Sequence, residues 1–364
     1  MKGAAAGHDV SWADVNELVE RSDPSSKDFK LSFDGLLPKR AYVEGYFDIG
    51  TFRHRLIKPV VYDYLKRGAT LIVNKIKNEP WVNHYASAVA RFTGRQVVSS
   101  AYVAFGSKDS FRAHWDTRDV FAVQLIGRKR WIVYQPSLES PLYMQQSKDL
   151  EHRYPCPEKP TMDIVLEPGD IFYLPRGWWH NPLPLGEPTV HLALGTFPAY
   201  GMDYLTWTLQ RMQEVVEARR SLSQWDSDRD TVDAMARQMS ELLVKPDNYL
   251  RFMDEFMDAT RFESPLALER FGDANAEPLG EHVRIGLSTH KPHRLADGYV
   301  IANGVRLNLD GASRPLMEHI ASHSGVSLYE LRQRFPEMDG EKMQRLIDAL
   351  CCQDVLAPYP TEPR

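Results

Sequence analysis

Cysteine is scarce in this sequence, and long apolar runs are absent. The three cysteines, Cys156, Cys351 and Cys352, are an odd number with two adjacent, which excludes a framework of paired disulfides. No apolar stretch approaches the roughly 18 residues of a membrane-spanning helix, and the first twenty residues contain no apolar core of a secretory signal. We therefore expect a protein of a reducing compartment, with the cytoplasm as the simplest location and no membrane partner.

The sequence also lacks an excess of charge of one sign. It has 44 basic and 49 acidic residues, for a net charge of −5, which favours neither a nucleic-acid binder nor a polybasic membrane protein. No P-loop, G-x-G-x-x-G, G-x-S-x-G or C-x-x-C motif occurs. The chemistry of this chain must therefore be sought in other residue patterns.

Periodicity divides the chain into three predicted domains. With 364 residues, 43% of them hydrophobic, the chain is long enough to form two or three domains. Residues 1–200 contain a lead-in and a β-rich catalytic segment, residues 201–280 have helical periodicity, and residues 281–364 form a compact α/β unit. The predicted fold class is α+β, with a small β-barrel followed by helices.

A His and an Asp stand two residues apart, and a second His follows far downstream. His114 and Asp116 precede an apolar run, and His180 ends another. Side chains at i and i+2 of an extended segment leave on the same face, so the first two residues can hold one ion together. Two His and one carboxylate leave three positions of an octahedral metal open, as in non-haem Fe(II) oxygenases.

The context of these residues makes the metal interpretation specific. An H-x-D pair alone is a weak signal, and a distal His is more often a core residue that bonds a carbonyl. Residues 120–126 and 129–134, however, predict two strands around a turn at Gly127-Arg128. Turn residues at 168–170 and 175–177 bracket a further short strand just before His180. Turn, strand, turn and His are typical of a β-barrel that carries metal ligands.

Residues 70–196 resemble the JmjC domain of the ribosomal oxygenase (cupin-4) family, which are Fe(II)- and 2-oxoglutarate-dependent protein hydroxylases. The matching residues are His114-Trp115-Asp116, the DVFAVQLIGRKRW run, GDIFYLPRGWWH, and VHLALG at 190–195. The resemblance implies a double-stranded β-helix, the barrel of JmjC and cupin proteins. It also implies that His114, Asp116 and His180 bind iron, and that Lys129 and Tyr102 contact the distal carboxylate of 2-oxoglutarate.

Lys129 can be interpreted without the family. A Lys inside a barrel strand is costly to desolvate unless an anion meets it, and strand alternation would turn Lys129, Trp131 and Val133 to one face. The alternative is that Arg128, Lys129 and Arg130 form a solvated cationic turn. Tyr102 has an equally ordinary alternative, since a Tyr in a strand is usually there for packing.

The substrate-facing residues depart from the family pattern. The approach to His114 is polar and charged where many relatives are rich in Gly and Pro. We expect Asp109, Trp115, Asp119 and Trp179 to contact the substrate, and a pocket lined by either Asp would suit a cationic target such as Arg. His191 lies in an apolar strand and is assigned a hydrogen-bonded core role.

The last two parts of the chain predict protein contacts. An amphipathic helical segment after such a barrel either packs on it or pairs two protomers, and the family resemblance favours a homodimer. The order of elements in residues 281–364 resembles a winged helix, with an Asn303-Gly304 hairpin. Residues 313–364 contain six basic and eight acidic side chains, so DNA or RNA binding through this tail is not expected.

The leading hypothesis is an enzyme, a 2-oxoglutarate-dependent dioxygenase with Fe(II), 2-oxoglutarate and O₂, that hydroxylates a side chain of a protein or peptide. A ribosomal protein is a candidate substrate. Alternatives are a hydroxylase that tailors a peptide natural-product precursor, a metal-dependent cupin without 2-oxoglutarate, and a non-catalytic cupin that binds a partner. The sequence does not separate stable hydroxylation from demethylation, because both begin with the same hydrogen abstraction.

Overall fold

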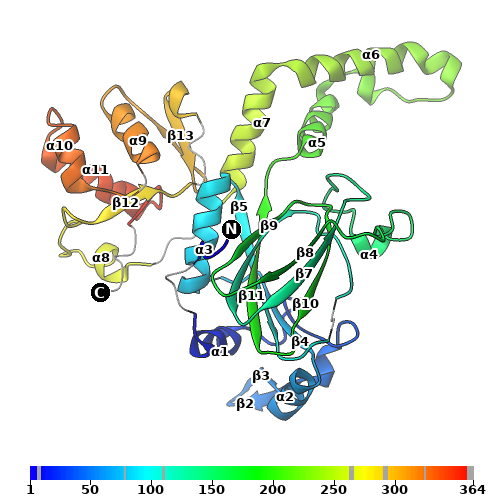
Figure 1. Cartoon of the computed structure of the whole chain (residues 1–364). Coiled ribbons are helices and arrows are strands. Elements are labelled where there is room, and N and C mark those ends of the chain that lie inside the picture. Colours follow the sequence, from blue (N-terminus) through cyan, green and yellow to red (C-terminus); the bar gives the residue numbers. More distant parts are fainter. Residues whose placement is uncertain are drawn as a thin grey trace. The chain divides into compact units, whose positions relative to one another are not determined.

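A computed structural model describes residues 1–5, 10–77, 79–108, 111–261, 266–289, 294–323 and 325–358. The chain forms two compact units, Met1–Phe197 and Pro198–Arg364 (Figure 1). Each unit is described by itself below. The division of the second unit into a helical and a winged-helix-like domain stays a prediction. Among the described residues, none of the helices has the length and hydropathy needed to cross a membrane.

The first unit is built on two antiparallel sheets. The larger has the order β1 (Phe29–Ser32), β4 (Thr70–Asn74), β5 (Gln96–Ala104), β11 (Thr189–Phe197), β6 (Asp119–Ile126) and β9 (Ile171–Leu174). The smaller has the order β10 (Trp179–Pro184), β7 (Lys129–Tyr134) and β8 (Met162–Leu166). One buried cluster draws side chains from both sheets: Ala122, Trp131, Val133, Leu166 and Leu174. The sheets therefore face each other across a shared interior, as a barrel requires.

Strand alternation in β7 follows the sequence pattern. Lys129, Trp131 and Val133 are buried, and the residues between them are more exposed. The predicted turn before this strand is present, with Gly127 at a φ of +61°. A Cβ at Gly127 would lie 2.0 Å from the carbonyl oxygen of Pro188, so no larger residue fits this close approach.

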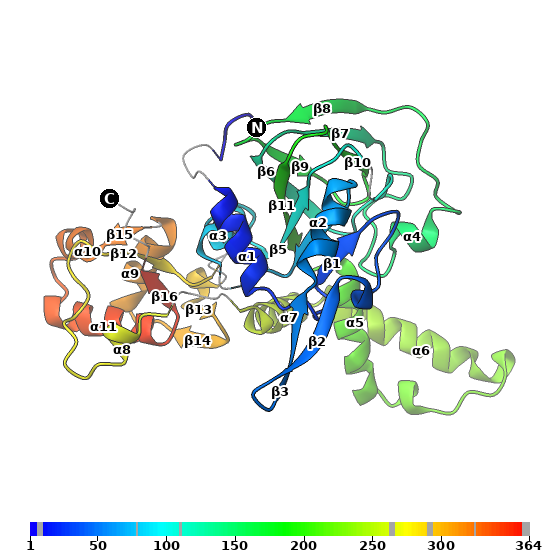
Figure 2. The ribbon, with the colours of Figure 1, turned by 90° about the horizontal axis from the view of Figure 1, so that it is seen from below.

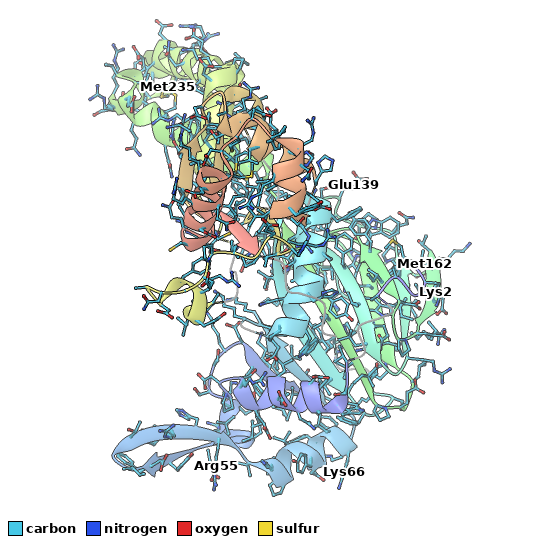
Figure 3. The ribbon with its side chains drawn as sticks, turned by 90° about the vertical axis from the view of Figure 1, so that its left-hand side faces the viewer. Lys2, Arg55, Lys66, Glu139, Met162 and Met235 are labelled. Carbon is cyan, nitrogen blue, oxygen red and sulfur yellow. The ribbon has the colours of Figure 1, made fainter. Side chains whose placement is uncertain are left out.

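Helices and a hairpin surround the sheets. The helix α3 (Pro80–Thr93) packs its buried side chains against Val123, Leu192 and Leu194 on the outer face of the large sheet. The other elements are α1 (Trp12–Arg21), a 3₁₀ turn (Lys39–Ala41), α2 (Lys58–Lys66), α4 (Ser147–Leu150), and the hairpin of β2 (Val43–Asp48) and β3 (Thr51–Leu56). The hairpin extends away from the sheets (Figure 2), and Arg55 points outward from it (Figure 3).

The second unit begins with helices. They are α5 (Gly201–Arg211), 3₁₀ turns at Met212–Glu214 and Glu217–Arg219, α6 (Trp225–Val244) and α7 (Pro246–Ala259). All three helices lie in residues 201–280, for which helical periodicity was predicted. No described residue of α6 is buried in the chain. This long helix therefore contributes little to the core of its own unit.

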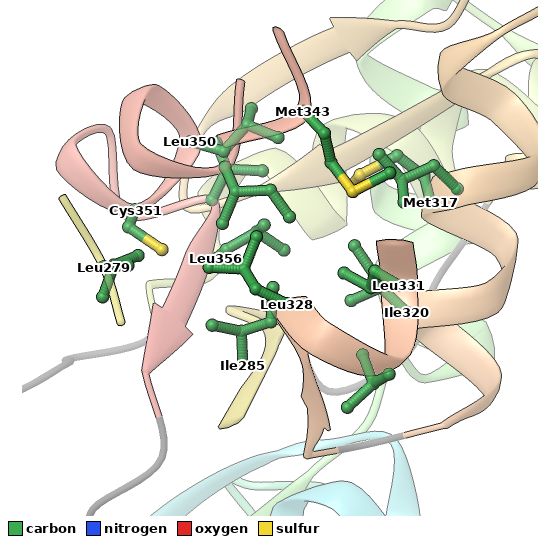
Figure 4. Close-up of a cluster of buried hydrophobic side chains, with 14 of the residues drawn as sticks. Leu279, Ile285, Met317, Ile320, Leu328, Leu331, Met343, Leu350, Cys351 and Leu356 are labelled. Atoms are coloured by element: carbon green, nitrogen blue, oxygen red, sulfur yellow. The ribbon is translucent and has the colours of Figure 1, made fainter. Parts of the chain in front are cut away.

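The remaining elements of the second unit surround an apolar core. They are α8 (Leu268–Phe271), β12 (Arg284–Leu287), a 3₁₀ turn (Leu295–Asp297), β13 (Tyr299–Ala302), β14 (Val305–Asn308), α9 (Ser313–Ser322), β15 (Val326–Ser327), α10 (Leu328–Arg334), α11 (Gly340–Cys352) and β16 (Leu356–Pro358). The strand order is β15-β12-β16, and β13 and β14 form a separate hairpin through Asn303-Gly304, as predicted. Ile285, Ile320 and Leu328 are fully or almost fully buried members of the core (Figure 4). The resemblance to a winged helix stays a prediction.

Candidate metal centre

A backbone bridge brings the two predicted His ligands together. The amide N–H of His114 donates to the carbonyl oxygen of His180 over 3.1 Å, and the amide of His180 donates to the carbonyl of His114 over 2.8 Å. Their rings lie with centroids 4.3 Å apart. Asp116 follows two residues after His114, and its Oδ2 lies 3.7 Å from Nε2 of His180. Segments remote in the sequence thus present three ligand-type side chains to one point.

The three side chains fit a metal ion. One ligand atom from each residue lies within 4.8 Å of the others. Two bonds of about 2 Å to a common ion can span up to about 4 Å, so small side-chain rotations would complete the set. Two imidazoles and one carboxylate suit a first-row transition metal and leave coordination positions for other ligands. Among the described residues, only this group of three is placed to hold a metal.

Each imidazole is oriented through its other nitrogen. Nδ1 of His114 lies 3.0 Å from the carbonyl oxygen of Arg112, and Nδ1 of His180 lies 3.1 Å from that of Trp178. A carbonyl only accepts, so each Nδ1 carries the proton and Nε2 keeps its lone pair. Metal-ligating histidines are commonly fixed by such a bond from the second ring nitrogen.

The electrostatics of His180 also suit ligation. Burial, and next the neighbouring His114, lower the pKa of His180, Asp116 opposes both effects, and the resulting pKa is about 4. The ring is therefore neutral at physiological pH. Neutral imidazole is the form that binds a metal, because its lone pair is not occupied by a proton.

A buried cation lies near the three ligand side chains. Lys129 is 2% exposed, and its Nζ lies 3.3 Å from Nδ1 of His191. The ring of Trp131 stands between the two regions, 5.8 Å from the ring of His180 and 5.6 Å from that of His191. Lys129 therefore points into the barrel interior and is not part of a solvated turn. Sequence reasoning gave His191 only a core role; its position opposite Tyr102 in β5 could have been inferred only from the strand pairing.

Tyr102 lies beside the same group. Its ring stacks on that of His191, with centroids 4.9 Å apart and planes 10° apart. Burial raises the pKa of Tyr102, and the charge of Asp116 raises it further, so the phenol is neutral and can donate a hydrogen bond. The structure thus groups Lys129, Tyr102 and His191 on one side of the predicted metal ligands.

Trp115 and Trp179, predicted to contact the substrate, are packing residues in the structure. They are 1% and 2% exposed, and their rings meet edge to face at 4.7 Å. Their Nε1 atoms donate to the carbonyl oxygen of Gln145 and to Oγ of Ser137. Each Trp is adjacent to a His ligand, and alternation in extended chain turns neighbours to opposite faces. The structure thus gives both indoles a packing role, and their contact with a substrate stays a prediction.

Of the two acidic residues predicted to contact the substrate, one has a defined partner inside the fold. Asp119 forms a 2.6 Å ion pair with Arg95 and accepts the amide of Arg176 over 3.0 Å. Its charge is already compensated inside the fold, which leaves little reason for a cationic substrate to bind there. Asp109 lies outside the described residues.

A double-stranded β-barrel with two His and one Asp gathered on one side defines a JmjC-type cupin. Residues 71–204 match the family model described as JmjC domain. Residues 71–204 are accordingly a JmjC domain, as the sequence resemblance indicated.

Curated relatives support this relationship over part of their length. Ribosomal oxygenase 1 of Gallus gallus is 28% identical over 202 residues, covering 51% of this chain and 33% of that protein. Ribosomal oxygenase 1 of Bos taurus is 34% identical over 164 residues, covering 41% of this chain and 22% of that protein. The bifunctional lysine-specific demethylase and histidyl-hydroxylase NO66 of Drosophila persimilis is 29% identical over 163 residues, covering 44% and 23%. The matched region thus spans a third or less of these proteins.

A solved structure shares the fold over nearly the whole chain. The ribosomal oxygenase YcfD from Escherichia coli, in complex with cobalt and 2-oxoglutarate, superposes with a TM-score of 0.56 at 18% identity. The match covers 98% of this chain and 93% of that chain. At this identity the similarity establishes the fold.

Proposed function

We propose that this chain is an Fe(II)- and 2-oxoglutarate-dependent oxygenase that hydroxylates a side chain of a protein or peptide. The observation that carries the proposal is the grouping of His114, Asp116 and His180 beside the buried cation Lys129. A metal site alone would suit many cupins. A buried ammonium next to it is suited to a cosubstrate that carries a second carboxylate.

In the proposed mechanism, the three ligand side chains hold iron and Lys129 holds the distal carboxylate of 2-oxoglutarate. The bound iron, with 2-oxoglutarate and O₂, would supply oxidation of a C–H bond to C–OH, one oxygen atom going to the substrate and one to succinate as CO₂ leaves. Tyr102 can donate a hydrogen bond from its neutral phenol to the same carboxylate. The indoles of Trp115 and Trp179 close the far side of the ligand-bearing strands and exclude water from it.

A protein substrate is supported by the relatives. Their names are ribosomal oxygenase and bifunctional lysine-specific demethylase and histidyl-hydroxylase, and we propose a ribosomal protein as the first candidate here. An Arg target was suggested by two acidic residues, and Asp119 no longer supports it because of its ion pair with Arg95. We propose a cytoplasmic location, consistent with the free cysteines 156, 351 and 352.

Turnover of 2-oxoglutarate tests the proposal. Succinate formation with Fe(II) should occur with the wild type and fall by at least about 100-fold in Lys129→Ala, because the buried charge that meets the distal carboxylate is gone. Arg130→Ala is the matched control: this residue faces outward and pairs with Asp163. Equal turnover in wild type and Lys129→Ala would remove Lys129 from this role. A +16 mass shift on ribosomal proteins, lost from deletion cells, would identify the substrate.

We also propose that the chain is a homodimer joined through α5, α6 and α7. This segment exposes many large apolar side chains, which a soluble surface rarely groups together: Met202, Leu205, Leu209, Val216, Leu222, Trp225, Val244 and Tyr249. Light scattering should give twice the chain mass for the wild type and the chain mass for a Leu209→Asp/Trp225→Asp variant. A monomeric wild type at micromolar concentration would contradict the proposal.

A further inference from the structure

The strand pairing of β11 puts His191 at a fixed place in the barrel interior. Its partners are Tyr102 on β5 and Gln124 on β6, and the side chain is 3% exposed. The ring lies flat on Tyr102 at 4.9 Å and meets Trp131 edge to face at 5.6 Å. Both contacts restrict the ring, so its nitrogens have defined directions.

The contact with Lys129 determines the protonation state of His191. An ammonium group has only donors, so Nδ1 of His191, 3.3 Å from Nζ of Lys129, must accept. The ring is then neutral, with its proton on Nε2. Burial and the charge of Lys129 both lower the pKa of His191, in agreement with this tautomer.

A neutral acceptor has a particular effect on a buried cation. A carboxylate in this position would hold the ammonium equally well, but would also neutralise its charge. The imidazole accepts one hydrogen bond from Lys129 and brings no negative charge of its own beside the ammonium. The hydrogen bond also restricts the flexible four-carbon side chain of Lys129. Less conformational entropy is then lost when this side chain binds a ligand.

We propose that His191 is a positioning residue that holds Lys129 as a charged donor for the distal carboxylate of a 2-oxo dicarboxylate. The proposal rests on the proposed function, since that function supplies the dicarboxylate. It concerns binding of the cosubstrate and not the metal ligands. His191 should therefore influence affinity for ligands that carry the second carboxylate, and no others.

Calorimetric binding to the full chain loaded with Mn(II) tests this without turnover. The probes are 2-oxoglutarate and 2-oxobutanoate, which share the 2-oxo acid end and differ in the distal carboxylate. His191→Phe keeps an aromatic ring against Tyr102 and removes the acceptor, so its Kd for 2-oxoglutarate should rise by about tenfold or more. Its Kd for 2-oxobutanoate should stay unchanged. His191→Asn, which retains an acceptor, should recover part of the affinity.

Two controls complete the test. His152→Phe makes the same change at an exposed position of the same unit and should bind both acids as the wild type does. In a double-mutant cycle, adding His191→Phe to Lys129→Met should cause no further loss, because the ring acts through that ammonium. Equal weakening of both acids by His191→Phe, or additive losses in the cycle, would overturn the proposal. A wild type that binds no 2-oxoglutarate would instead refute the proposed function.

Discussion

The cores of the two units are built from different kinds of side chain. The interior of the barrel contains Lys129, His180 and His191, each no more than 3% exposed. The main buried cluster of the second unit contains 17 residues, all of them hydrophobic or cysteine. Both interiors are well excluded from water, so burial alone does not distinguish them. The difference is that the barrel interior contains a lysine and two histidines, whereas the buried polar residues described in the second unit are only Thr208, Ser288 and Ser327.

This difference identifies which interior performs chemistry. Burying a polar or charged group without full compensation costs several kcal/mol, so an ordinary core avoids such groups. Perturbed titratable residues in an interior are accordingly indicators of a functional site. The described core of the second unit contains no buried charged side chain and no buried histidine, so it is built as a structural core.

Removal of a predicted ligand should have the largest effect. His180→Ala takes one of three ligand side chains from the barrel interior, and loss of a direct ligand exceeds the roughly 10- to 100-fold cost of losing a residue that merely orients one. We expect metal affinity to fall by more than about 100-fold, measured as bound metal per chain after dialysis. His152→Ala should retain metal as the wild type does. If His180→Ala retained as much metal as the wild type, the buried polar groups of the barrel would not mark it as the metal-binding interior.

The cysteines of α11 test whether the apolar core keeps its ionisable group neutral. Burial raises the pKa of Cys351 to about 12, and its neighbour Cys352 is exposed. At pH 8 the thiolate fraction of Cys351 is only about 10⁻⁴, which rises as pH approaches 12. We expect iodoacetamide to modify Cys352 at least about 100-fold faster in the native protein, by mass spectrometry. Equal rates before unfolding would contradict a closed core.

A cavity in the second core should affect stability and leave the barrel unchanged. Leu316 is fully buried in α9, and Leu316→Ala should cost about 2–5 kcal/mol in urea unfolding. Leu268→Ala, at a side chain that is 71% exposed, is the control and should change stability by less than about 0.5 kcal/mol. Metal binding should persist in Leu316→Ala below its unfolding midpoint, since Leu316 lies in the other unit. Loss of metal from the folded variant would show that the cores are coupled.

The smallest expected effect compares one motif in both units. Ser11 caps α1 in a reciprocal box with Asp14, and Ser327 caps α10 in a box with Glu330. Replacing either Ser with Ala should cost about 1 kcal/mol, because one backbone N–H at the helix start loses its acceptor. The two losses are measured by hydrogen exchange of the first turn of each helix. A loss of stability at the start of only one of the two helices would mean that the two capping boxes do not contribute equally.

Local patterns were sufficient to predict much of the fold. The alternation in β7 and the Asn303-Gly304 turn are determined by neighbouring residues, and the structure agrees at both places. The grouping of His114 with His180 was predictable because the spacing of ligand-type residues was combined with strand and turn signals. The parity of the extended chain could also have shown that Trp115 and Trp179 face away from the ligands.

Other features depend on contacts between distant segments. Asp119 is held by Arg95, and no pattern around either residue indicates that pair. The role of His191 depends on Lys129 and Tyr102, which approach it from two other strands. The hairpin of β2 and β3 was not predicted because its aromatic residues, such as Phe47 and Phe52, are exposed where such residues usually indicate burial.

The paired amides and carbonyls of positions 114 and 180 have a thermodynamic consequence. These backbone hydrogen bonds contribute to offsetting the entropic cost of closing the long stretch of chain between the two positions. In a zinc finger the binding energy of the metal must also fold the chain, whereas here the backbones of positions 114 and 180 pair directly and bring the two imidazoles together.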